Sequence, residues 1–192
     1  MSKERICLEL KTFQGTPLTI DYAGELAEFF FRTNASSVGP KAYDAWVATS
    51  AEPNRITVED VAAVNRTMAA RTSYKYWTPL TDVAADAPWL AVLDPAWDLY
   101  AMPEAEWLGH VVHRSLGEAF KEVMRPHLGP AVTTKVLHAK RPRLIPICDS
   151  YVARTMGVTF GDEVGWRDLL RLVMHLRKQG QANLDALLQT TL

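Results

Sequence analysis

The chain has 192 residues, of which 48% are hydrophobic and 22% charged, and its net charge at pH 7 is −1. This composition is typical of a globular protein that is long enough to bury a core. The near-neutral charge excludes a global basic field, so any nucleic-acid binding requires a local patch. No apolar run reaches the ~18 residues of a membrane span, so no membrane association is expected.

The first residues are charged and lead into an apolar run that is too short for a signal peptide. Ile6, Leu8 and Leu10 alternate with more polar residues, which predicts one short N-terminal strand. Cys7 and Cys148 lie far apart in the chain and form no metal-binding or redox pair. These features predict a protein of the reducing cytoplasm with both thiols free.

Helical patterns dominate the remaining sequence. The clearest start is Thr57, which is followed by Glu59 and Asp60 in the manner of an N-cap. Gly180 is expected to end the longest C-terminal helix. A loop is expected at residues 34–40, and a loop or helix end at residues 74–77. Helices are expected at residues 20–32, 43–49, 87–93, 104–124, 131–140, 163–179 and 182–188. The sequence therefore predicts an all-α fold, a single helical domain over residues 1–192 with room for two lobes.

Residues 135–152 are the most informative stretch of the chain. They read as the end of a helix, a basic crossover with two prolines, and a helix opened by Asp149. Pro142 and Pro146 each disfavour helical geometry at the residue before them, so the crossover is expected to be extended. Asp149 is expected to N-cap a helix that runs to about Met156, with Gly157 as its C′ residue.

Two resemblances follow from the order of these features. Residues 43–46, 56–64 and 134–149, the last with its Lys-Arg-Pro…Pro…Asp string, resemble an uncharacterised family of bacterial proteins of about this size. More distantly, the segment Pro126-His127-Leu128-Gly129, the next helix and Asp149 are similar to the helix-hairpin-helix base-excision DNA glycosylases of the endonuclease III type. That resemblance implies a glycosylase-like fold over residues 104–180, with Asp149 as the catalytic carboxylate.

Three departures from the glycosylase pattern limit what the resemblance implies. His127 replaces the first hairpin glycine, and a side chain at this position reaches positive φ less freely than glycine. Ala131 stands where the bifunctional enzymes carry their lysine, so a Schiff-base lyase is not expected. No four-cysteine cluster motif follows, and no cofactor is expected. A monofunctional hydrolase of N-glycosidic bonds, or a binding protein on the same scaffold, is compatible with these departures.

Asp149 is the candidate catalytic residue. Its carboxylate could stabilise a sugar that develops positive charge and could orient water during N-glycosidic cleavage. The alternative is a purely structural N-cap. Around it lie six potential cations that could contact phosphates, or could form a solvated basic face: Lys135, His138, Lys140, Arg141, Arg143 and Arg154.

Aromatic and metal-ligating residues also allow a functional and a structural interpretation. Tyr74, Tyr76 and Trp77 lie beside cationic residues and could stack bases, or could anchor the core. Glu106, His110 and His113 share one side of a predicted helix, but a solvated face explains them better than a metal, and no metal site is expected. Cys148 is expected to be a small buried residue.

Three hypotheses about function remain open at this point. The first is a nucleobase N-glycosidase-like or nucleic-acid-interacting protein that uses Asp149. The second is an enzyme on the same scaffold that acts on an anionic small metabolite through the basic crossover. The third is a non-catalytic interaction protein in which Asp149 only caps a helix.

Overall fold

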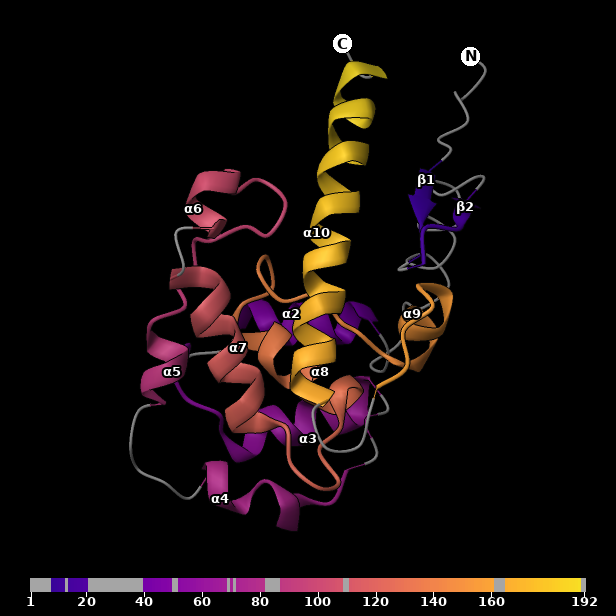
Figure 1. The fold of residues 1–192 in the computed structure, drawn as a ribbon. Coiled ribbons are helices and arrows are strands. Elements are labelled where there is room, and N and C mark those ends of the chain that lie inside the picture. The colour runs from indigo at the N-terminus through magenta and orange to yellow at the C-terminus, as the bar shows by residue number, and fades with distance from the viewer. Residues whose placement is uncertain are drawn as a thin grey trace.

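A computed structural model describes residues 8–12, 14–20, 40–49, 52–68, 70, 72–81, 87–108, 111–160 and 165–190. This part of the chain is mostly helical, which confirms the predicted all-α class (Figure 1). The helices are α2 (Pro40–Thr49), α3 (Val58–Thr67), the 3₁₀ turn η1 (Tyr74–Tyr76), α4 (Thr78–Thr81), α5 (Pro88–Ala91), α6 (Glu104–Leu108), α7 (Val111–Val123), α8 (Pro130–Lys140), α9 (Ser150–Thr155) and α10 (Gly165–Thr190).

An N-terminal hairpin precedes the helices. β1 (Leu8–Lys11) pairs antiparallel with β2 (Pro17–Ile20), so the single predicted strand has a partner that sequence patterns did not reveal. The prediction of a helix from Ile20 is wrong at that residue, and residues 21–39, with the rest of that helix and most of the 34–40 loop, lie outside the described residues. The backbone of Lys11 is tied to α10 by His175 and Gln179, so the hairpin lies beside that helix (Figure 1).

Two predicted helix boundaries differ in the structure. The helix expected at residues 104–124 is described as α6 and α7, with residues 109 and 110 outside the described residues. At the C-terminus, α10 continues through Gly180, so the predicted break and separate last helix are wrong. A Cβ at Gly180 would lie 2.2 Å from the Tyr100 ring. Gly180 therefore permits a close approach of Tyr100 and does not terminate the helix.

The predicted start at Thr57 is confirmed by a complete capping box. Asp60 N–H donates to the Thr57 hydroxyl at 3.2 Å, and Thr57 N–H donates to the Asp60 carboxylate at 2.6 Å. These two bonds satisfy backbone donors that a helix start would otherwise leave without partners.

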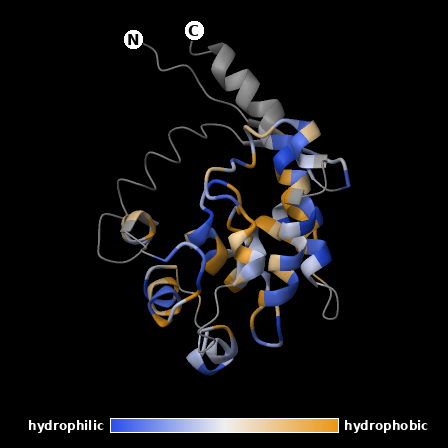
Figure 2. Cartoon of the chain, turned by 90° about the vertical axis from the view of Figure 1, so that its left-hand side faces the viewer, coloured by the Kyte–Doolittle hydropathy of each residue, from blue (hydrophilic) through white to orange (hydrophobic). Residues whose placement is uncertain are grey.

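One hydrophobic core runs between α3, α7, α8 and α10, where hydrophobic residues of several helices converge in the middle of the molecule (Figure 2). The apolar face of α7 is buried at Val112, Leu116, Ala119 and Val123. Gly117 on the same helix lets α10 approach closely, because its missing Cβ would lie 3.3 Å from Leu170. Burial of this surface from water is the main stabilising contribution to the arrangement. In the described part of the chain, no helix is both long enough and apolar enough for a membrane span.

Candidate functional site

The α7–α8 connection is a tight turn. Leu128 N–H donates to the carbonyl of Arg125 at 2.8 Å, with Pro126 and His127 between them. His127 has a φ of 71°, the left-handed conformation that normally favours glycine. The histidine therefore adopts the backbone geometry that the glycosylase resemblance assigns to a glycine, at a cost in strain.

A glycine at position 127 should relieve that strain. We expect His127→Gly to be more stable than His127→Ala by about 1 kcal/mol, because alanine keeps the Cβ clash at positive φ. Both variants lose the imidazole equally, so the difference between their free energies of unfolding reports the backbone strain at positive φ. Urea unfolding of the two variants measures it. The matched control is Gly129, which has a φ of −70° and open space within 4 Å of where a Cβ would lie, so Gly129→Ala should not lower stability. Equal stability of the two position-127 variants would contradict the strain.

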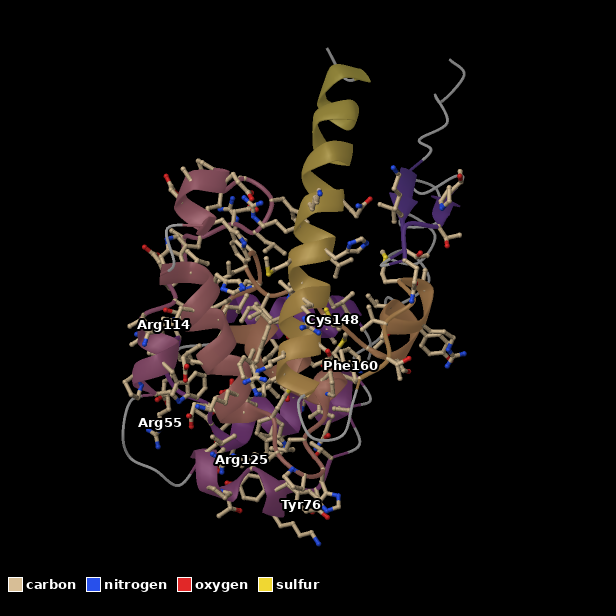
Figure 3. The ribbon with its side chains drawn as sticks, in the orientation of Figure 1. Arg55, Tyr76, Arg114, Arg125, Cys148 and Phe160 are labelled. Carbon is tan, nitrogen blue, oxygen red and sulfur yellow. The ribbon has the colours of Figure 1, made fainter. Side chains whose placement is uncertain are left out.

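The predicted aromatic segment meets this turn, not Asp149. The Tyr76 ring stacks on His127 with ring centroids 4.4 Å apart, and the ammonium of Lys75 lies 4.9 Å from the Tyr76 centroid. In Figure 3, Tyr76 lies at the lower end of the molecule, well separated from Cys148, the neighbour of Asp149. The structure thus places the two predicted parts of the site in different regions.

The other two aromatic residues of that segment have structural contacts. Trp77 is fully buried in the core. The Tyr74 hydroxyl lies 2.9 Å from that of Thr81, and Tyr74 is 39% exposed. The segment itself is a 3₁₀ turn followed by α4, so the predicted loop is regular over part of its length. Trp77 therefore serves as a core anchor in this fold.

Arg141 is the most constrained residue of the basic crossover. Its side chain is fully buried, and its five N–H donors all bind the protein itself. The acceptors are the carbonyls of Leu93, Pro53 (2.7 Å), Lys140 (2.8 Å) and Leu90 (2.6 Å) and the side-chain oxygen of Asn54 (2.6 Å). Burial lowers the pKa of Arg141, and the carboxylate of Asp94 partly opposes that shift. Arg141 is a structural residue here and has no donor left for a bound anion.

Lys140 is also committed to the interior. Its ammonium lies 2.7 Å from the Asp60 carboxylate, with the two side chains 1% and 2% exposed, and it donates to the Glu52 carbonyl at 3.0 Å. Burial raises the pKa of Asp60, while the hydrogen bond and charge of Lys140 act in the opposite direction. Of the six predicted cations, Lys140 and Arg141 thus form a buried network and do not fit the expected anion site.

Three further predicted cations, two on α8 and one in the crossover, have protein partners. Lys135 Nζ donates to the Met68 carbonyl at 2.9 Å. His138 Nδ1 lies 2.6 Å from the Ile145 carbonyl oxygen, and the histidine ring stacks on Tyr43. Arg143 is 63% exposed and binds the carboxylate of Asp98 at 2.8 Å. Their role in anion binding stays a prediction.

The crossover begins with a turn and is not extended over its first half. Lys140 ends α8 as the position of Pro142 predicted, but the amides of Leu144 and Ile145 donate back to the Arg141 carbonyl at 3.1 and 2.9 Å. The first half is therefore a turn, which Pro142 fits because its fixed φ suits the second position of a turn. Residues 146–148, just before Asp149, have no helix, strand or turn, and their extended conformation stays a prediction.

Asp149 caps α9 as predicted. One carboxylate oxygen, Oδ1, accepts the N–H groups of Tyr151 at 2.9 Å and Val152 at 3.1 Å. The other oxygen, Oδ2, receives no hydrogen bond from the residues that the structure describes, and the side chain is half-buried. The helix ends as predicted at Gly157, which has a φ of 70°. Asp149 is therefore fixed in orientation with one oxygen left for another partner.

A threonine that the sequence analysis missed holds this segment against α8. Cys148 N–H donates to the Thr134 hydroxyl at 3.0 Å, and that hydroxyl donates to the Pro130 carbonyl at 2.9 Å. Cys148, the residue before Asp149, is thereby held against α8. A threonine inside a helix gives no signal of this contact in a sequence.

Residues 23–191 match the model of a family of unknown function, DUF6308. The chain belongs to this family. No curated protein and no solved structure shows a significant match to it. The expected membership of an uncharacterised family is thus confirmed, whereas the Lys-Arg-Pro motif and the glycosylase resemblance stay predictions. Because DUF6308 is a family of unknown function, membership in it assigns this chain no activity.

The remaining candidate groups of this DUF6308 protein are inert or structural. Burial, with a smaller contribution from Asp149, raises the pKa of the Cys148 thiol to about 12, so the thiol stays protonated at neutral pH. His113 lies 3.1 Å from the Met174 sulfur and meets the Trp107 ring edge-on, so it packs between helices and is not on a solvated face. His110 lies outside the described residues, and the described residues contain no group of three or more metal-ligating side chains.

Proposed function

We propose that this protein hydrolyses N-glycosidic bonds between a nucleobase and its sugar, with Asp149 as the carboxylate that stabilises the sugar. The proposal is supported by the asymmetry of the Asp149 carboxylate. Two backbone donors hold Oδ1, so the cap keeps the group in place, and Oδ2 stays free of donors among the described residues. A fixed anion aimed at a position where positive charge develops needs no reorganisation during the reaction.

In this reaction the bond between C1′ and the base nitrogen breaks, and its electron pair leaves with the base. Positive charge develops on the sugar, where the Asp149 carboxylate stabilises it electrostatically. A water molecule then forms a bond to C1′ and gives up a proton, which the free Asp149 oxygen can accept. The departing base takes up a proton, so the net reaction is hydrolysis to a free base and a sugar hydroxyl.

The chain's own residues favour a monofunctional mechanism. Ala131 occupies the position at which the resemblance places a Schiff-base lysine, in the first turn of α8. The alternative enzyme, which would hold an anionic metabolite with the basic crossover, is disfavoured because Lys140 and Arg141 are buried and engaged. Any contact with a phosphate would therefore be made by exposed cationic residues other than Lys140 and Arg141.

The test is base release by Asp149→Asn. Asparagine caps helices about as well as aspartate, so the fold and the unfolding free energy should stay near wild type. The amide carries no charge to stabilise the sugar, so base release should fall by at least about a hundredfold. The measurement is release of free base from nucleotides and from single- and double-stranded oligonucleotides that carry uracil, hypoxanthine or N-alkylated purines.

Asp94→Asn is a matched control. Asp94 also caps a turn through its side chain, accepting Ala96 N–H at 2.8 Å, so the same charge is removed from the same kind of contact. It should release base as wild type does. Wild-type protein that releases no base from any of these substrates rejects the proposed function. So does an Asp149→Asn variant with full activity, which would leave Asp149 as a structural cap.

A further inference from the structure

Tyr151 is a large aromatic residue that the fold does not use for packing. It is 73% exposed, more than any other exposed large hydrophobic side chain that the structure describes. It lies in the first turn of α9, where its neighbour Ala153 carries the buried contact. Tyrosine has a lower helix propensity than alanine, lysine or glutamate. Neither core packing nor helix formation explains a tyrosine at this position.

Arg154 accompanies that ring. It is exposed, three residues further along α9, and its guanidinium carbon lies 5.6 Å from the centroid of the Tyr151 ring. Residues three apart share one side of a helix, and a guanidinium over an aromatic face is attracted by the ring. The pair therefore presents a flat aromatic surface and a positive charge together.

The position of the pair is set by Asp149. The backbone N–H of Tyr151 is one of the two donors that bind Asp149 Oδ1. The carboxylate and the aromatic residue are thus connected through a single hydrogen bond, and the ring stands two residues from the proposed catalytic group. Aromatic faces stack nucleobases of any sequence, and arginine binds phosphate through a fork of donors.

We propose that Tyr151 and Arg154 bind a nucleoside phosphate, with the base stacked on the tyrosine ring and the phosphate on the arginine. This inference rests on the proposed function and names its substrate class: a phosphorylated nucleotide unit, free or within a single strand, and not an unphosphorylated nucleoside. Because the net charge of −1 gives no overall attraction for an anion, an anionic substrate has to be held by local cations such as Arg154.

The test is equilibrium binding with protein that carries Asp149→Asn, which prevents turnover. Calorimetry is run with adenosine, adenosine 5′-monophosphate and a ten-nucleotide deoxyadenosine strand. Adding Tyr151→Ala should weaken binding of the monophosphate about tenfold, whereas Tyr151→Phe should keep it, because the ring is retained. Arg154→Gln should weaken the monophosphate severalfold and leave adenosine unchanged. Comparing the affinity for the monophosphate with the affinity for the strand shows whether the protein prefers a free nucleotide or a nucleotide within a single strand.

Arg171→Gln is the matched control, since Arg171 is an exposed arginine, 68% accessible, on α10. It should bind all three probes as the parent does. Parent-like binding by Tyr151→Ala and Arg154→Gln overturns the inference, as does a parent that binds none of the probes. Nucleotide binding without base release rejects the proposed function and keeps this site. Base release with an unchanged KM in Tyr151→Ala rejects this site and keeps the proposed function.

Discussion

Replacing Arg141 with lysine should lower the free energy of unfolding by about 4 kcal/mol, because lysine offers three donors where five acceptors are arranged. The carbonyls of Leu90 and Leu93 then compete for an ammonium that cannot match the planar fork. Each buried acceptor left without a donor costs about 1–3 kcal/mol. Urea unfolding followed by circular dichroism gives the number.

Arg143→Lys is the control for that substitution. Arg143 lies two residues away, is 63% exposed and pairs with Asp98 at the surface, where such pairs contribute up to about 1 kcal/mol. Its conversion to lysine should change stability by less than about 1 kcal/mol. If Arg141→Lys unfolds at the same urea concentration as Arg143→Lys, the buried guanidinium does not hold α8 to α5 and residues 53–54.

Asp60→Asn should also be strongly destabilising, by about 3–5 kcal/mol, because it leaves the ammonium of Lys140 buried without its partner charge. Lys140→Met should cost a similar amount, since it leaves the Asp60 carboxylate in the same position. The double variant buries no charge, and the asparagine oxygen can still accept the N–H of Thr57. We expect its loss of stability to be smaller than the sum of the two single losses.

A double-mutant cycle in urea measures this coupling. The expected interaction energy between the two positions is about 2–3 kcal/mol, because each single change leaves a charge that the second removes. If the stability losses of the two single variants simply add in the double variant, the two residues are not coupled, which would contradict the ion pair. The comparison uses free energies of unfolding, so it does not depend on any assumed activity.

Local signals predicted the segment around Asp149 well. Proline, aspartate and glycine each restrict the backbone through their own chemistry, so the cap at Asp149 and the C′ residue at Gly157 followed from residues a few positions apart. The conformation around Pro142 was harder to predict, because its fixed φ suits both an extended segment and the second position of a turn. The structure resolves that ambiguity through two bonds to the Arg141 carbonyl.

The burial of Lys140 and Arg141 could not be predicted in this way. Their partners lie 48 to 88 residues earlier in the chain, and a run of basic residues is ordinarily a surface feature. The prediction at Gly180 was wrong for a similar reason. Glycine disfavours helices locally, but here its presence is explained by the close contact with Tyr100. The roles of Lys140, Arg141 and Gly180 depend on distant neighbours and were missed, whereas Asp149 and Gly157 act on their own backbone and were predicted correctly.

The most direct test of the central claim compares two sugar analogues bound to wild-type protein and to Asp149→Asn. One oligonucleotide carries a cationic pyrrolidine in place of the target sugar, and the other carries a neutral tetrahydrofuran of the same shape. If Asp149 stabilises a sugar cation, wild type should prefer the cationic analogue by at least about tenfold, or about 1.4 kcal/mol, and the asparagine variant should lose that preference. An equal preference in both proteins would contradict the proposed role of Asp149.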